Sequence, residues 1–375
     1  MTSSLPLSPV ALPAAAGRIP ATIVTGFLGS GKTTLLRHLL QNARGRRIAV
    51  IVNEFGELGI DGELLRNCAI GCEEDSASPS GTVFELANGC LCCTVQEEFY
   101  PVMRELIARR AQIDHILIET SGLALPKPLV QAFNWPEIKT ACTVDAVVTV
   151  VDVPATAEGQ FAANPQAVDQ QRRADPNLDH ESPLHELFED QLSAADLVVL
   201  SKTDLVDEQA LAGVERTVRA ALPPEVGIVR VRHGELDPAL LFGLDREAEA
   251  HIHLRPGHHA HHDDEDHGDH GDHGHDHDAF DAVVVDLPEV GRERLLDALH
   301  ALVRTRTVYR VKGFAAVPGK PMRLVVHGVG RRFDSYFDRP WPADEARTTQ
   351  LVVIGLELEA AAVREQLLQA TAGAD

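Results

Sequence analysis

The segment from Gly26 to Thr33 reads GFLGSGKT, which fits the pattern G-x-x-x-x-G-K-[ST]. It follows an apolar run from Thr22 to Thr25, typical of a buried strand, and it precedes a helical pattern from Thr33 to Leu40. Glycines in such a turn let backbone N–H groups wrap around a phosphate at the start of the helix, where the helix dipole favours an anion. The segment therefore predicts a strand–loop–helix unit of the P-loop type, and a chance glycine-rich turn is a poor alternative in this context.

The residues of this segment have separate predicted roles. Lys32 is expected to reach the β- and γ-phosphates of a nucleotide, and the hydroxyl of Thr33 is expected to bind Mg²⁺. Backbone N–H groups of the loop and of the first helical turn would complete the contacts to the phosphates. The remaining predicted nucleotide contacts are Gly26, Gly29, Ser30, Gly31 and Thr34.

Short apolar runs alternate with helical patterns through the first two thirds of the chain. Continuous apolar strands separated by helices are typical of a parallel sheet whose two faces are both covered. We therefore expect a doubly wound, mostly parallel α/β fold over residues 21–250. Besides Thr22 to Thr25, the predicted strands are Arg47 to Val52, His115 to Ile118, Ala146 to Val151, Leu197 to Leu200 and Ile228 to Val231.

The segment HILIETSG ends a predicted strand with Glu119 and Gly122 in an E-x-x-G arrangement. An acid at this position can bind Mg²⁺ through water, and the glycine N–H can contact a γ-phosphate. The alternative is a buried acid that caps a helix. We interpret Lys32 and Glu119 as the catalytic residues and Gly122 as a nucleotide contact.

The segment VVLSKTD follows a later predicted strand and offers Ser201, Lys202 and Asp204. The Asp204 carboxylate could accept hydrogen bonds from both N1–H and N2–H of guanine, a pairing that adenine cannot supply. The apolar stem of Lys202 could pack on the base. A lone K-x-D tripeptide is common, but its position after the strand favours guanine over adenine.

Five of the six cysteines lie between Cys68 and Cys93, which favours metal or redox chemistry over a disulfide scaffold in a chain of 375 residues. The segment ELANGCLCC places Cys90, Cys92 and Cys93 on one turn. Clustered thiolates suit Zn²⁺, Cu(I) or Co²⁺. We therefore predict a metal site at these three cysteines, the alternative being that one or two of them are small buried side chains.

Other candidate ligands lie nearby in the chain. Glu54, in the loop NEFGELGIDG, is a candidate oxygen ligand for the same metal, and a solvated acidic loop is an equal alternative. Cys68 and Cys72 could form a second pair of ligands, whereas Cys142, which precedes a predicted strand, fits a core position better. The loop that holds Glu54 follows the second predicted strand and could act as a switch segment.

Composition divides the rest of the chain. Residues 1–20 are rich in Ala, Pro and Ser and are expected to form a flexible leader. Residues 251–279 hold 11 His, and from His258 to Asp278 no apolar side chain is larger than Ala. Burial cannot offset the entropy of ordering such a segment. We expect a flexible linker whose imidazoles capture metal weakly, or a tether that only adds solubility.

From residue 280 onward apolar patterning returns, which predicts a small α+β domain over residues 280–375. The predicted strands are VVVDL, YRVKG, RLVVHGVG and LVVIGLEL. One predicted helix runs from Arg292 to Val303, and a second closes the domain near Ala360.

The formal charge of −22 comes from 56 acidic and 34 basic residues, which opposes binding to nucleic acid or to an anionic membrane. The first 20 residues lack the basic start of a secretory signal, and no apolar run approaches the roughly 18 residues that span a bilayer. We expect a cytoplasmic protein that has neither nucleic acid nor a membrane as a partner.

The motifs together resemble those of the CobW family, a branch of the metal-handling P-loop GTPases that also include UreG and HypB. The matching segments are GFLGSGKTT, NEFGELGIDG, ELANGCLCCTV, ETSGLALPKP, the SKTD element, YRVKG and DRPW, which together cover nearly the whole chain. The segments ETSGLALPKPLVQAFNWPE and CAIGC are most similar to the branch that serves aerobic cobalamin biosynthesis. Ser201 departs from the pattern, because these GTPases usually have Asn there, so weaker support of the base loop is expected.

The resemblance implies slow hydrolysis of GTP with Mg²⁺, binding of Co²⁺ or Zn²⁺ at Cys90, Cys92 and Cys93, and delivery of Co²⁺ to a cobaltochelatase. A homodimer is a further expectation. Two alternatives stay open at this point. One is a zinc chaperone GTPase that supplies zinc enzymes, and the other is a passive storage protein in which the His-rich stretch binds the metal.

Overall fold

The computed structural model describes residues 17–43, 45–53, 82–86, 99–162, 168, 184–242, 280–342 and 346–372, with the backbone alone described for 82–86. Most of the predicted leader and the whole His-rich stretch 251–279 lie outside the described residues. The predicted metal ligands also lie outside them, namely Glu54, Cys90, Cys92 and Cys93, as do Cys68 and Cys72.

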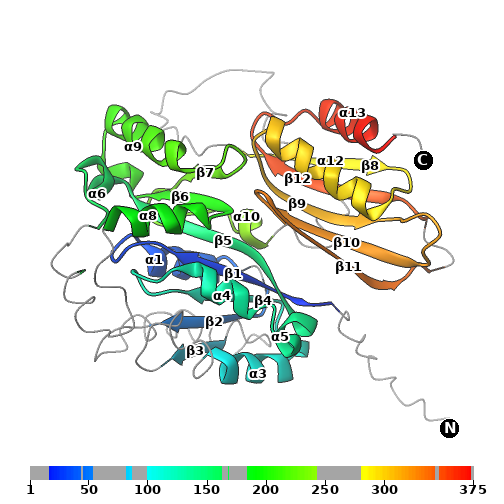
Figure 1. The fold of residues 1–375 in the computed structure, drawn as a ribbon, viewed down its shortest axis with the longest axis horizontal. Coiled ribbons are helices and arrows are strands. Elements are labelled where there is room, and N and C mark those ends of the chain that lie inside the picture. The colour runs from blue at the N-terminus through cyan, green and yellow to red at the C-terminus, as the bar shows by residue number, and fades with distance from the viewer. Residues whose placement is uncertain are drawn as a thin grey trace, which may run out of the picture.

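Within the described residues, a seven-stranded sheet forms the centre of the N-terminal domain, and all its neighbouring strands are parallel (Figure 1). The order is β3-β2-β4-β1-β5-β6-β7. The chain passes from β1 to β2, toward one edge of the sheet, and from β5 to β6, toward the opposite edge. The strand order therefore reverses direction between β1 and β5, and α/β folds bind ligands at such a point, where the loop after β1 lies. The predicted doubly wound fold is confirmed. The strands are β1 (Ile19–Thr25), β2 (Ile48–Asn53), β3 (Thr82–Leu86), β4 (His115–Glu119), β5 (Cys142–Asp152), β6 (Leu197–Ser201) and β7 (Gly227–Arg230).

Two of these strands differ from the sequence prediction. The short edge strand β3 was not predicted, because TVFEL follows a polar stretch and has no long apolar run. Strand β5 begins at Cys142 instead of Ala146, and the cysteine is a buried core residue as expected. The first four residues of β5 include Thr143 and Asp145, whose polar side chains hid the strand from a pattern search.

Alternate side chains of the strands pack against helices on opposite faces of the sheet. Val24 and Val150 share a buried cluster with α1 (Lys32–Gln41) and α10 (Pro238–Phe242). The alternate residues Ile23 and Val151 face the other helices. These are α3 (Tyr100–Ala108), α4 (Pro126–Ala132), α5 (Pro136–Ala141), α6 (Val153–Ala157), α8 (Leu184–Ser193) and α9 (Glu208–Ala221). Among the described residues, no helix combines the length and apolar character needed to cross a lipid bilayer.

The C-terminal domain is a five-stranded antiparallel sheet, with one face covered by α12 (Arg292–Thr305) and α13 (Ala360–Thr371) (Figure 1). Its strand order is β11-β10-β9-β12-β8, and the predicted α+β fold is confirmed. Strand β11 was not predicted, because its sequence RFDSYFDRP alternates charged and aromatic residues. The strands are β8 (Asp281–Leu287), β9 (Val308–Ala315), β10 (Met322–Val329), β11 (Arg332–Pro340) and β12 (Thr349–Gly355).

The other face of this antiparallel sheet packs against the N-terminal domain. Tyr309 and Val352 belong to the same buried apolar cluster as Val199 and Val229 of the parallel sheet. The Tyr309 hydroxyl also donates a hydrogen bond to the carbonyl oxygen of Ile228 on β7, at 3.2 Å. The two sheets therefore share part of one core.

Candidate functional site

The loop between β1 and α1 turns on glycines that have left-handed backbone conformations. Gly26, Gly29 and Gly31 have φ angles of 137°, 77° and 98°. Gly26 is also constrained by space, because a Cβ atom there would lie 2.2 Å from the carbonyl oxygen of Val150. Any other residue at these positions would be strained, so backbone geometry accounts for the glycines of the motif.

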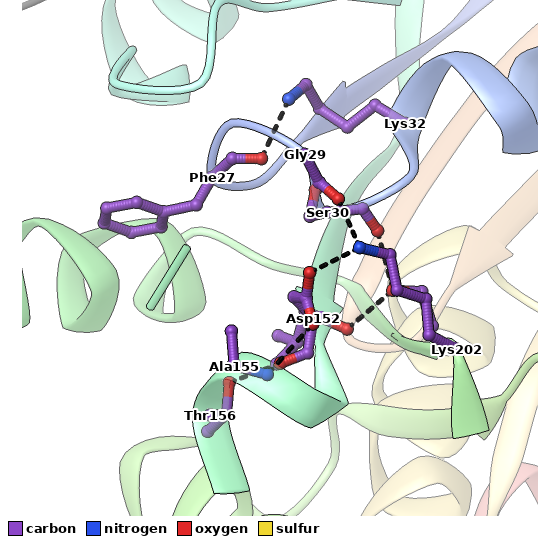
Figure 2. Close-up of polar contacts among 10 residues, drawn as sticks. Phe27, Gly29, Ser30, Lys32, Asp152, Ala155, Thr156 and Lys202 are labelled. Atoms are coloured by element: carbon purple, nitrogen blue, oxygen red, sulfur yellow. Dashed lines mark hydrogen bonds and ion pairs between the residues drawn. The ribbon is translucent and has the colours of Figure 1, made fainter. Parts of the chain in front are cut away.

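Lys32 folds back into the loop that precedes its own helix (Figure 2). Its ammonium donates hydrogen bonds to the carbonyl oxygens of Gly26 and Phe27, at 2.9 and 3.1 Å, and the residue is 6% exposed. A buried cation surrounded by loop backbone is suited to a phosphate group, whose charge it would counter. The structure thus places Lys32 at the centre of the predicted phosphate site.

Thr33 and Glu119 meet although they are far apart in the chain. The Thr33 hydroxyl donates to Oε1 of Glu119 at 3.1 Å, and Glu119, the last residue of β4, is 6% exposed. This pair fits Mg²⁺, which prefers hard oxygen ligands and usually keeps waters and phosphate oxygens in its shell. In the part of the chain that is described, no group of three or more His, Cys, Asp or Glu could hold a metal by itself.

Gly122 lies directly against the phosphate loop. A Cβ atom at this position would lie 2.5 Å from the backbone nitrogen of Leu28. On the other side, the buried side-chain amide of Gln191 on α8 donates to the carbonyl oxygens of Gly122 and Ala124, at 3.3 and 3.1 Å. The segment after β4 is therefore held between the loop and α8, and Gln191 is a supporting residue that the sequence motifs did not indicate.

Ser201, the last residue of β6, connects the predicted base loop to the phosphate loop. Its Oγ lies 2.6 Å from the carbonyl oxygen of Ser30 and 3.0 Å from that of Val151, so the hydroxyl can donate to either. Ser201 therefore contacts the phosphate loop directly, and the weaker support expected from the absence of an Asn side chain stays a prediction.

Lys202 and Asp204 follow on the same segment. Lys202 has a left-handed φ of 58°, and its ammonium lies 2.7 Å from the carbonyl oxygen of Gly29 and 2.6 Å from Oδ2 of Asp152 (Figure 2). Asp204 is exposed and lies in the 3-10 turn η3 (Thr203–Leu205). The structure thus brings Lys202 to the phosphate loop and leaves the Asp204 side chain 20% exposed.

The loop after β7 is a part of this site that the motif search missed. Gly234, with a φ of 79°, packs so closely that a Cβ atom would lie 2.8 Å from Cγ2 of Thr34. The Thr203 hydroxyl donates to the carbonyl oxygen of Val231 at 3.2 Å, and Nδ1 of His233 lies 3.7 Å from Oδ2 of Asp204. The sequence signal was a His-Gly pair soon after a predicted strand, which is too common to indicate a site.

The predicted metal ligands can be related to this site through chain order alone. Strand β2 ends at Asn53, next to Glu54 in the chain, and β3 ends at Leu86, shortly before Cys90. Asn53 pairs with Leu86, one residue beyond the pairing that joins β2 to Glu119. The strands that precede Glu54 and Cys90 in the chain therefore end at the same edge of the sheet as Glu119.

A doubly wound parallel sheet with this loop after a central strand defines a P-loop nucleotide-binding protein. A buried lysine in the loop, a hydroxyl at the start of the helix and an acid on the adjacent strand are the usual parts of a nucleotide hydrolase. The chain belongs to the CobW/HypB/UreG family. The nucleotide-binding domain of that family matches residues 20–230, and the C-terminal domain of the cobalamin synthesis protein cobW matches residues 282–371.

Several relatives align with nearly the whole chain. The zinc chaperone CobW of Pseudomonas aeruginosa is 67% identical over 95% of this chain and 92% of its own length. The zinc chaperone CobW of Sinorhizobium sp is 51% identical over 93% of this chain and 96% of its own length. The zinc chaperone YjiA of Escherichia coli is 31% identical, with shares of 92% and 96%. The chain is accordingly a P-loop GTPase of the metallochaperone class.

Proposed function

We propose that the chain is a zinc metallochaperone that binds Zn²⁺ tightly while it holds Mg²⁺ and GTP, and that hydrolysis releases the ion to a metal-accepting protein. The observation that carries the proposal is the position of Glu119. This acid accepts a hydrogen bond from the Thr33 hydroxyl at 3.1 Å, and it is the last residue of β4. Strand β4 pairs with β2, and β2 pairs with β3. Adjacent strands lie about 4.8 Å apart, so the strand that leads to the cysteine cluster lies only about 10 Å from β4.

On the nucleotide side, each residue would have a distinct task. Lys32 would counter the charge of the β- and γ-phosphates, and Thr33 and Glu119 would hold Mg²⁺ directly or through water. Bound Mg²⁺ would supply further positive charge where negative charge develops on the transferred phosphoryl group. Asp204 would accept two hydrogen bonds from guanine. Unassisted GTPases turn over at roughly 10⁻⁴ to 10⁻² per second, and we expect this slow range.

The cargo is the metal ion, and we propose Cys90, Cys92 and Cys93 as its ligands, with Glu54 as a candidate fourth. Thiolate sites generally hold Zn²⁺ more tightly than Co²⁺, and the relatives above carry zinc in their names. Delivery of Co²⁺ to a cobaltochelatase is the second candidate, favoured by the match of residues 282–371 to a domain of a cobalamin synthesis protein. A cytoplasmic location and a homodimer stay predictions from the sequence.

We infer the gating from the strand order, because β2 and β3, which precede Glu54 and Cys90 in the chain, lie on the same side of β1 as β4 and its Glu119. In GTPase switches, the γ-phosphate and its Mg²⁺ order the switch segments, and hydrolysis releases them. Suppose that the metal site is able to bind metal in about 1% of molecules without the γ-phosphate and in about 99% with it. The nucleotide must then bind the metal-binding conformation about 10⁴-fold more tightly than the other one. By linkage, bound metal must strengthen binding of the GTP state by the same factor.

The test is a competition between the protein and a metal chelator, performed with Zn²⁺ and with Co²⁺, in Mg²⁺-GDP and then in Mg²⁺ with a non-hydrolysable GTP analogue. We expect higher affinity with the analogue and, for Co²⁺, absorption from thiolate-to-metal charge transfer. The variants Cys92→Ser and Cys93→Ser should lose both effects while they still bind the nucleotide.

A chain that lacks residues 258–278 serves as the control. It should bind fewer weakly held ions, because imidazoles are common metal ligands. It should keep the nucleotide-dependent site, because the cysteines proposed for that site lie outside the deleted segment. Equal metal affinity in both nucleotide states would contradict the gated chaperone and favour storage. Nucleotide-dependent affinity that is confined to Co²⁺ would favour the cobalt candidate over zinc.

A further inference from the structure

Asp152 ends β5 and caps the N-terminus of α6, and both of its carboxylate oxygens are used. Oδ1 accepts a hydrogen bond from the backbone N–H of Ala155 at 3.1 Å, and Oδ2 accepts one from the ammonium of Lys202 at 2.6 Å. The carboxylate is 1% exposed and the Lys202 side chain 32% exposed. An N-cap requires one oxygen only, so the second oxygen serves the lysine.

The Lys202 ammonium joins three segments that are distant in sequence (Figure 2). It bonds the end of β5 through Asp152 and the phosphate loop through the carbonyl oxygen of Gly29, and it belongs to the segment that also carries Asp204. The backbone of Lys202 is left-handed, with a φ of 58°. A non-glycine residue keeps such a conformation when its surroundings hold it there. The lysine is therefore fixed by its own backbone and by two contacts at its tip.

Fixing this side chain has a consequence for binding. A lysine side chain has many rotamers, and a ligand that packs on it must otherwise restrict them. An ammonium that is already bound at two sites leaves the apolar stem little freedom to lose. A nucleotide would then meet a preformed wall, and its affinity would be higher than with a mobile lysine.

We propose that Asp152 is a positioning residue for the nucleotide. Through its ion pair it holds Lys202 as one wall of the base site, beside the Asp204 carboxylate, without itself contacting the base. The proposal rests on the assignment of Lys202 and Asp204 to guanine in the proposed function.

The test begins with Asp152→Asn in the full chain. Asparagine keeps the oxygen that caps α6 and loses the charge that holds Lys202. The Kd for GDP should rise roughly tenfold, the amount that corresponds to a weakened charge-assisted hydrogen bond. Asp207→Asn is a matched control, because Asp207 caps α9 in the same way by accepting the N–H of Ala210, three residues along, at 2.8 Å. The control should bind GDP like the parent protein.

A double-mutant cycle separates positioning from a structural role. Lys202→Met keeps an apolar stem and removes the ammonium, so it should weaken GDP binding by a similar factor. Adding Asp152→Asn to Lys202→Met should have no further effect, because residues that act through one contact are not additive. If Asp152→Asn does not fold, Lys202→Met and Lys202→Arg test the same ion pair, and the arginine should recover most of the affinity.

The possible results have distinct meanings. The proposal is overturned if Asp152→Asn binds GDP like the parent protein, or if it weakens binding equally in the Lys202→Met background. A failure of arginine to recover affinity in Lys202→Arg, where Asp152→Asn is unfolded, overturns it as well. Should Lys202→Met itself bind GDP like the parent protein, the proposal is overturned as well, because that variant keeps the apolar stem and loses only the ammonium that Asp152 holds. The assignment of this segment to guanine is tested separately by Asp204→Asn.

Discussion

Arg310 on β9 and Asp145 on β5 form an ion pair of 2.9 Å between the two domains, with side chains only 2% and 1% exposed. Arg310 also donates to the carbonyl oxygen of Leu241 at 2.7 Å. Burial by itself would raise the pKa of Asp145, but the Arg310 guanidinium, with His327 and His115 nearby, holds it below its ordinary value. The carboxylate is therefore ionised inside the interface, and its charge depends on Arg310.

Replacing Arg310 with methionine should destabilise the protein by about 3–5 kcal/mol, because Asp145 is left buried without a counter-charge. The free energy of urea unfolding of the nucleotide-free protein measures the change. Arg230→Met is the control, since its pair with Glu215 has side chains 38% and 28% exposed. A surface pair of this kind contributes less than about 1 kcal/mol. Equally small losses in both variants would contradict a structural role for the buried pair.

Gly122→Ala should weaken GTP binding about tenfold, because overpacking of 1–3 kcal/mol is expected where the new Cβ meets backbone. The atom it would meet is the nitrogen of Leu28 in the phosphate loop, at 2.5 Å. Gly213→Ala is the matched control, since a Cβ there has only the distal Nη2 of Arg216 within reach, at 4.0 Å. This change lies inside α9 and should leave GTP affinity unchanged while it stabilises the fold by about 0.5–1 kcal/mol. Normal GTP affinity in Gly122→Ala would show that the loop can shift without loss.

Asp204→Asn should lower the affinity for GTP by about 10- to 100-fold, because a charged acceptor of two guanine N–H groups becomes a neutral one. Affinity for ATP should not change, so selectivity falls. Affinity for xanthosine triphosphate should rise, since the new amide can donate to the oxygen that xanthine carries in place of the guanine amino group. Titration of the three nucleotides measures the pattern. An equal loss for GTP and ATP would mean that Asp204 supports the loop without reading the base.

We expect the protein to lose stability in mild acid because of two histidines, His115 and His327. Burial lowers the pKa of His115 to about 3 and that of His327 to about 4, from an ordinary value of 6.5. Asp145 opposes both shifts, whereas Arg310 and Lys312 add to them. Between pH 6.5 and 4 the unfolded chain therefore binds protons that the folded protein does not. The free energy of unfolding should fall by up to about 1.4 kcal/mol per pH unit for each histidine.

Urea unfolding of the nucleotide-free protein at about pH 7.5 and about pH 5 measures this loss. His327→Gln removes one of the two rings, whose Nε2 lies 3.5 Å from the hydroxyl of Tyr336. The pH-dependent part of the loss that these two rings cause should then fall by roughly half. An identical loss in the variant and the parent protein would exclude His327 as a source of the acid sensitivity.

Local signals account for what the sequence predicted at the nucleotide loop. The glycines of GFLGSGKT predict a left-handed backbone, and the apolar run before them predicts a buried strand. Neighbouring residues alone therefore predict β1, the loop and α1. Glu119 could be associated with Thr33 because each belongs to a motif of known spacing. Asp152, Gln191 and the loop after β7 belong to no such motif, and only their contacts reveal them.

Sequence by itself determined that this chain forms a parallel sheet with a phosphate loop, because hydrophobic period and glycine conformation are properties of short segments. Tertiary structure alone decided where polar residues belong inside that frame. Thr143 and Asp145 are polar residues that a sequence pattern does not assign to a buried strand. In the structure, partners from the other domain bind them: the Thr143 hydroxyl donates to Oδ2 of Asp334 at 2.7 Å, and Arg310 donates to Oδ2 of Asp145 at 2.9 Å. The physical reason is that a buried polar group is stable only when a partner satisfies it, and that partner can lie anywhere in the chain.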